Sequence, residues 1–116
     1  MQPASYNLVI KENSDFSQVF TLNDPNTGAP LNLTGYEAYS QVRISYSDAT
    51  PLITFSTAID GINGKITISA TKSQLSGLSV SNAIAQAIWD LMIKDTNNIT
   101  TCIIQGGVTL IPAVTR

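Results

Sequence analysis

Residues 36–46 read YEAYSQVRISY, which is the longest strict alternation in the chain. Successive side chains of a β-strand point to opposite faces. The stretch therefore predicts a strand with one face toward a core and the other toward solvent, as in an antiparallel sheet. The expected inward set is Tyr36, Ala38, Ser40, Val42, Ile44 and Tyr46, and the outward set is Glu37, Tyr39, Gln41, Arg43 and Ser45.

The same period-two pattern recurs along the chain, and turn residues interrupt it every eight to twelve positions. Residues 79–92 also fit a helix, but Trp89 alternates with Leu91 and Ile93 at strand spacing, so we favour a strand over 85–94. This spacing predicts an all-β fold. We expect a single immunoglobulin-like β-sandwich of seven or eight antiparallel strands over residues 1–116, with a jelly roll as the second choice. The other predicted strands cover 6–11, 16–22, 52–57, 65–70 and 99–111.

Three local signals refine this prediction. Asn63-Gly64 favours a type I′ hairpin turn, since both residue types tolerate positive φ. Thr71 with Gln74 three residues later fits the capping box of a short helical turn. The Gly106-Gly107 pair suggests a β-bulge in the last strand.

Composition excludes most catalytic machinery. The chain has no histidine and one cysteine, Cys102, so Ser-His-Asp and Cys-His mechanisms and tetrahedral zinc sites are excluded. The acidic residues lack the spacing of a calcium loop, and turn chemistry explains Asp60 beside Asn63. We therefore expect a protein that is not an enzyme, with no catalytic residue, no metal and no cofactor.

The charge balance limits the partners. Lysine and arginine together number six and the formal net charge is −2, which disfavours nucleic-acid binding. No apolar run approaches the roughly 20 residues of a membrane span, and the N-terminus lacks the pattern of a signal peptide. Cys102 has no intrachain partner, so a reducing compartment is expected.

Charged residues make up 12% of the chain, against about 25% in typical domains. Charges, lysines above all, protect free strand edges from unwanted pairing. A chain with so few of them is either a sparsely charged monomer or a component whose edges neighbours cover. We favour the second interpretation, a homo-oligomer or repeated copies in an assembly.

Two segments are candidate contact surfaces. Tyr39 lies on the polar face of its strand beside Gln41 and Arg43, and an exposed tyrosine among polar neighbours is a reasonable interface anchor. The loop over residues 24–30 is predicted to be exposed and presents Asp24 and Asn26.

Short motifs along nearly the whole chain resemble those of small structural proteins of tailed bacteriophages and prophages. The pattern is similar to the N-terminal immunoglobulin-like domain of phage baseplate upper proteins, which attach receptor-binding proteins to a tail. The motifs are YNLVI at residues 6–10, FSQVF at 16–20, GAP at 28–30, LTGY at 33–36, QVR at 41–43, GKI at 64–66, WDL at 89–91, GGV at 106–108 and PAVTR at 112–116.

The resemblance implies a virion structural protein assembled in the cytoplasm of the host bacterium, with other phage structural proteins as partners. The chain has no receptor-binding extension after the domain, which favours an adaptor at a tail, baseplate or fibre junction. One alternative is a capsid decoration (cement) protein, which has nearly the same sequence requirements. Another is a carbohydrate-binding module that uses Trp89 and the tyrosines, although the face that Trp89 shares with Leu91 favours a core position.

Overall fold

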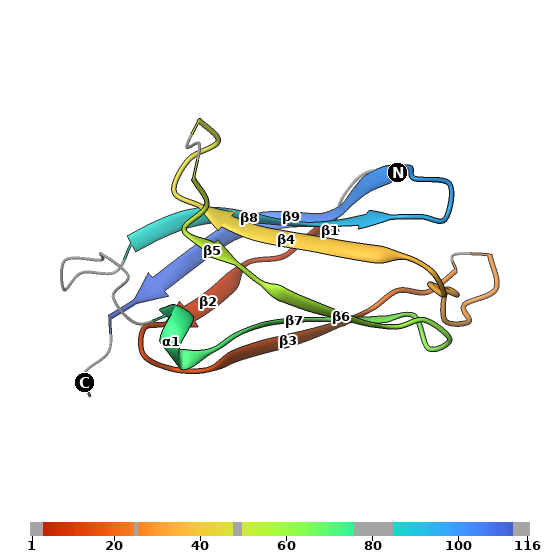
Figure 1. Cartoon of the computed structure of the whole chain (residues 1–116), viewed down its shortest axis with the longest axis horizontal. Helices are drawn as coiled ribbons and strands as arrows, with labels where there is room; N and C mark the ends of the chain where they lie inside the picture. Colours follow the sequence, from red (N-terminus) through yellow and green to blue (C-terminus); the bar gives the residue numbers. More distant parts are fainter. Residues whose placement is uncertain (1–3, 25, 48–49, 76–84, 113–116) are drawn as a thin grey trace.

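The protein is a sandwich of two β-sheets (Figure 1), and this confirms the all-β prediction. The computed structural model describes residues 4–24, 26–47, 50–75 and 85–112. None of the helices in those ranges is long and apolar enough to cross a membrane. The elements are β1 (Ala4–Ser5), β2 (Leu8–Lys11), β3 (Phe16–Thr21), β4 (Glu37–Arg43), β5 (Ile53–Thr54), β6 (Ser56–Asp60), β7 (Lys65–Ala70), α1 (Lys72–Leu75), β8 (Ala85–Lys94) and β9 (Thr100–Ile111).

The larger sheet has the order β1-β9-β8-β4-β5, with β2 also pairing with β9, and the smaller sheet has the order β3-β7-β6. The chain passes repeatedly between the two sheets, since β2, β4 and β8 belong to the larger sheet and β3 and β7 to the smaller one. One detail departs from the expected antiparallel pairing, because β1 and β2 run parallel to β9, with Leu8 opposite Val108. Two parallel neighbouring strands need a long connection. Here the connection between β2 and β9 contains all the elements from β3 to β8.

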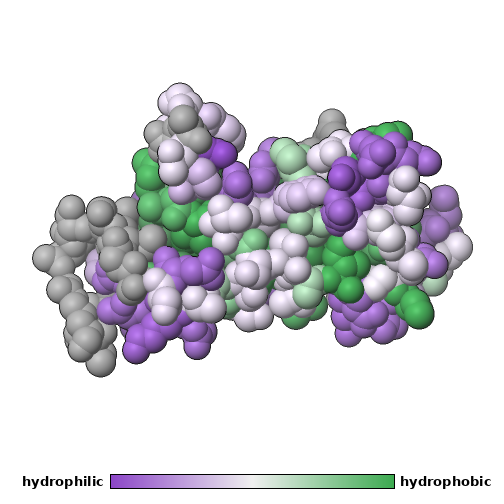
Figure 2. Space-filling model, in the orientation of Figure 1, coloured by the Kyte–Doolittle hydropathy of each residue, from purple (hydrophilic) through white to green (hydrophobic). Residues whose placement is uncertain are grey.

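The core lies between the sheets and takes alternate side chains from both. Ile10 and Leu91 of the larger sheet and Ile66 of the smaller one have no exposed surface. Trp89 is 3% exposed and stacks on Phe20, with ring centroids 5.7 Å apart. The predicted core position of Trp89 is therefore confirmed. The surface in Figure 2 mixes pale and green atoms along its middle, and purple atoms gather toward its ends and loops.

The predicted strand over 36–46 ends early. β4 stops at Arg43, and Ile44 and Tyr46 are 51% and 88% exposed. The expectation that both face inward is wrong, because the chain leaves the sheet and begins the loop toward β5.

The predicted strand over 52–57 is divided between the two sheets. β5 pairs with β4 in the larger sheet, whereas β6 pairs with β7 in the smaller sheet. The chain crosses at Phe55, which is buried and whose N–H donates to the Ser40 carbonyl oxygen over 3.0 Å. Alternation alone could not reveal the crossing, because the inward side chains stay inward on both sides of it.

Two of the three local predictions need correction. Gly64 has φ +63°, but Asn63 is not among the described residues with positive φ, so Asn63 and Gly64 are not the central pair of a type I′ turn. The bulge lies opposite Leu91/Met92 and not at the glycines. Gly106 instead admits the carbonyl group of Tyr6, which a Cβ at that position would strike.

The capping box is confirmed. The Thr71 N–H donates to Oε1 of Gln74 over 2.9 Å, and the Gln74 N–H donates to Oγ1 of Thr71 over 3.3 Å. The two reciprocal bonds satisfy backbone donors at the start of α1.

Candidate functional site

The outer face of the larger sheet brings three predicted contact residues together. Tyr39, Gln41 and Arg43 point outward from β4, and their partners across the ladder on β8 are Met92, Asp90 and Ile88. All six side chains therefore stand on two rigid, adjacent strands. We call this surface the β4–β8 face.

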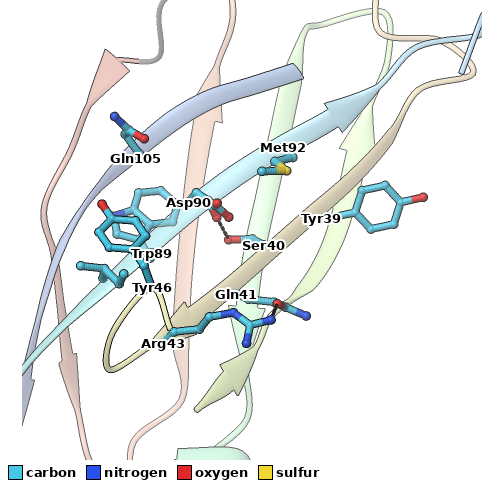
Figure 3. Close-up of a pocket in the computed structure, with 10 residues that line it drawn as sticks. Tyr39, Ser40, Gln41, Arg43, Tyr46, Trp89, Asp90, Met92 and Gln105 are labelled. Carbon is cyan, nitrogen blue, oxygen red and sulfur yellow. Dashed lines mark hydrogen bonds between the residues drawn. The ribbon is translucent and has the colours of Figure 1, made fainter. Parts of the chain in front are cut away.

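A shallow pocket of about 380 Å³ lies on the β4–β8 face (Figure 3). Gln105 of β9, directly opposite Asp90, adds a third strand to the wall. Tyr46, in the loop after β4, also lines the pocket. The pocket thus combines two tyrosines, a methionine and an isoleucine with amide, carboxylate and guanidinium groups.

One end of the face is organised around Glu37. Oε2 of Glu37 lies 2.9 Å from Nζ of Lys94 on β8 and accepts a 2.6 Å hydrogen bond from the Tyr39 hydroxyl. The bond from Lys94, and then that from Tyr39, hold the pKa of Glu37 below its ordinary value. The contacts fix the Tyr39 ring on the surface, where it remains 48% exposed.

The middle of the face carries a partly buried carboxylate. Burial raises the pKa of Asp90, and the positive charge of Arg43 opposes this shift. Nη2 of Arg43 donates to Oε1 of Gln41 over 2.9 Å, which holds these two side chains side by side. Beneath them, the buried Ser40 hydroxyl donates to the main-chain oxygen of Asp90 over 2.7 Å and joins β4 to β8.

The β4–β8 face offers hydrogen-bonding, charged and apolar groups to a ligand or partner. Within the described ranges, His, Cys, Asp and Glu side chains nowhere gather in a group of three that could hold a metal ion. Cys102 of β9 is partly buried, and burial followed by the charge of Asp90 raises the pKa of its thiol. A raised pKa leaves little reactive thiolate at neutral pH.

The structure does not bring Asp24 and Asn26 to this face. They lie between β3 and β4, where Oδ1 of Asp24 accepts a 2.8 Å hydrogen bond from the Asn26 N–H. The Asp24 N–H donates to the Ala29 carbonyl oxygen over 2.8 Å, so the loop is held by its own contacts. Neither residue lines the pocket.

Sequence reasoning missed several residues of the site. Asp90 and Met92 alternate with buried neighbours, so the β8 pattern places them on the outer face, but it cannot identify β4 as the neighbouring strand. Gln105 gave no signal, because the bulge in β9 shifts the pairing beside it. Tyr46 was assigned to the opposite face by the alternation that ends at Arg43.

Comparison of the chain with protein-family models gave no match, and a search of curated proteins also found none.

Proposed function

We propose that the protein is a non-enzymatic virion structural protein, an adaptor at a phage tail, baseplate or fibre junction that docks through the β4–β8 face. The observation that carries the proposal is the gathering of Tyr39, Tyr46, Met92 and Arg43 on one solvent-facing surface. Tyrosine, methionine and arginine are enriched at protein interfaces relative to the rest of protein surfaces. Strands position Tyr39, Arg43 and Met92, so little backbone entropy is lost at these residues when a partner docks.

A protein partner fits this surface better than a sugar does. The carbohydrate-binding alternative relied on Trp89, whose ring is buried against Phe20 and unable to stack on a ligand. The two tyrosines of the pocket lie toward different parts of it, Tyr39 on β4 and Tyr46 in the following loop (Figure 3). An adaptor needs only a stable patch of mixed polar and apolar groups, which is what the face supplies.

The phage assignment rests on the resemblance of the short motifs to phage structural proteins. In that setting the partners are other phage structural proteins, and the chain works in repeated copies. Its low charge fits a component that stays in contact with neighbours, since few charged side chains need to remain in water.

The test is tagging of the chain in purified phage particles and viewing the tag by electron microscopy. We expect label at the tail or its tip. Label over the head would favour the cement alternative, and unlabelled complete particles would contradict a virion role.

The docking face is tested separately with Tyr39→Ala plus Arg43→Ala. We expect at least a tenfold loss of incorporation into particles. The control is Lys65→Ala plus Thr67→Ala on β7, which changes the exposed face of the other sheet and should incorporate like the parent. Equal incorporation of both variants would show that the β4–β8 face is not the docking surface.

A further inference from the structure

One side of β3 has no neighbouring strand within the described ranges, and β3 runs along the lower margin of the sandwich in Figure 1. In an immunoglobulin sandwich of the constant type, the corresponding sheet has four strands in the order A-B-E-D. Here the smaller sheet has three, because both N-terminal strands pair with β9 instead. In the part of the chain that the structure describes, no strand takes the position beside β3 that strand A would fill.

The backbone of β3 is oriented to receive such a strand. The Leu22 N–H, directly after β3, donates to the Gly64 carbonyl oxygen, which places the even-numbered residues of β3 in hydrogen-bonded pairs with β7. Alternate residues of an antiparallel pair turn their backbone groups the other way. Ser17, Val19 and Thr21 thus direct their N–H and C=O groups to the free side.

A side-chain contact marks the same free side. The Val19 carbonyl oxygen accepts a 3.3 Å hydrogen bond from the side-chain amide of Gln18. The edge also lacks the usual protection against pairing, since β3 has no charged residue, no proline and no bulge. Val19 is 49% exposed at its centre.

We propose that a second copy of this chain occupies the position, with the two β3 strands antiparallel about a two-fold axis at Val19. In a virion this pairing would supply one contact between neighbouring copies of the chain. That role of the pairing rests on the proposed function. The reason for choosing a second copy is that the edge is self-complementary. A two-fold interface requires each residue to suit its symmetry partner.

The register about Val19 matches like with like along most of the edge. On the outer face Ser17 meets the partner copy's position 21, a threonine, and Val19 meets its own equivalent. On the inner face the partly buried Phe16 meets position 22, a leucine, of the other copy. Gln18 opposite Phe20 is the exception, because a polar side chain meets an aromatic one. In the dimer, a backbone N–H of the second copy would replace the Gln18 side-chain amide as the donor to the Val19 carbonyl oxygen.

No like charges oppose one another in this register. Asp15, just before β3, meets position 23, an asparagine, and Oδ1 of Asp15 already accepts a 2.6 Å hydrogen bond from the Lys72 N–H. Ser17, Val19 and Thr21 each form a pair that exchanges both backbone hydrogen bonds. The two smaller sheets then join into one continuous sheet.

The first test is sedimentation velocity of the purified chain over a concentration series. We expect a monomer–dimer equilibrium that Val19→Lys weakens at least tenfold, because it sets two ammonium groups against each other at the two-fold axis. The matched control is Val9→Lys, since Val9 is 60% exposed on β2 of the other sheet. A monomeric parent, or equal effects of the two substitutions, would overturn the proposal.

The second test reads the register with cysteines in a Cys102→Ala background. Paired residues lie about 5.5 Å apart between Cα atoms, within the range that a disulfide spans. A mixture of the Ser17→Cys and Thr21→Cys chains should form a crosslinked heterodimer under mild oxidation. Ser17→Cys alone should not, because its two copies are offset by about 14 Å along the strand. Equal crosslinking in both samples contradicts the register.

Both tests use the free protein, so their failure is distinguishable from failure of the virion role. A monomeric chain that labels phage tails overturns the β3 pairing and leaves the adaptor function standing. A dimer in solution that is missing from particles supports the pairing and contradicts the virion role.

Discussion

Nε1 of Trp89 donates a 2.7 Å hydrogen bond to the carbonyl oxygen of Tyr6. The same indole stacks on Phe20 of the smaller sheet. One side chain of β8 therefore joins the N-terminal segment and both sheets.

Replacing Trp89 with phenylalanine keeps an aromatic ring against Phe20 but removes the donor to Tyr6. An unsatisfied carbonyl costs about 1–3 kcal/mol, and the smaller ring adds a cavity. We expect a free energy of unfolding lower by at least this amount in urea titrations. Tyr6→Phe is the control, since it keeps the carbonyl group and should change stability by less than about 0.5 kcal/mol. Similar losses in the two variants would mean that the hydrogen bond contributes little.

Alanine substitutions at two glycines with similar backbone conformations distinguish the cost of backbone strain from the cost of steric crowding. Gly64 (φ +63°) and Gly28 (φ +72°) both adopt the left-handed region, where a side chain costs about 1–2 kcal/mol. A Cβ on Gly64 would lie 2.6 Å from the Leu22 carbonyl oxygen, whereas one on Gly28 would meet nothing within 4 Å. Gly64→Ala should therefore lose about 1–3 kcal/mol more than Gly28→Ala. Equal unfolding midpoints in urea would refute the crowding argument.

Glu37 should make stability fall in acid. Lys94 and Tyr39 lower its pKa from the ordinary value of 4.5, so the folded state binds the proton less readily than the unfolded chain. The stabilisation is then complete above about pH 4.5 and disappears as the pH falls through the folded-state pKa. Because the group is at the surface, the effect is modest and screened by salt. Urea titrations between pH 7 and pH 2 should show a shallower acid loss for Glu37→Gln than for the parent.

Asp90 should act in the opposite direction. Burial raises its pKa above the ordinary value of 3.8, so the folded state binds the proton more readily than the unfolded chain. Its charge therefore lowers stability as the pH rises through the window just above 3.8. Asp90→Asn should be more stable than the parent at pH 7 and differ little from it at pH 3. The same chemical change at Glu37 serves as the control, and a destabilised Asp90→Asn protein at pH 7 would contradict the sign.

Alternation predicted the strands well because inward side chains need a period of two wherever one face of a sheet is buried. The core positions of Leu91 and Trp89 and the capping box of Thr71 follow from local pattern alone. The outward position of Tyr39, Gln41 and Arg43 on β4 was predicted for the same reason, since these residues alternate with buried neighbours.

The errors arise where distant parts of the chain decide the local structure. Ile44 continues the alternation but has left the sheet, and the crossing at Phe55 depends on a bond to Ser40 of another strand. Gly106 reads as a bulge signal, yet its cause is the carbonyl of Tyr6, a hundred residues away in sequence. Predicting the pocket requires the order of β4, β8 and β9 in the sheet, and a local sequence pattern does not reveal that order.

The parallel pairing of β1 and β2 with β9 also determines how the domain carries tension. Ala4 pairs with Ile104 and Lys11 pairs with Ile111, so the chain enters this ladder at one end and leaves it at the other. A pull between Ala4 and Pro112 loads the backbone hydrogen bonds of the ladder in shear, all together. A pull between Glu12 and Pro112 opens the same ladder from one end, bond by bond. Single-molecule pulling should therefore give a higher rupture force for attachment at Ala4 and Pro112 than for attachment at Glu12 and Pro112. The domain resists force best when the force acts along the β1/β2–β9 ladder.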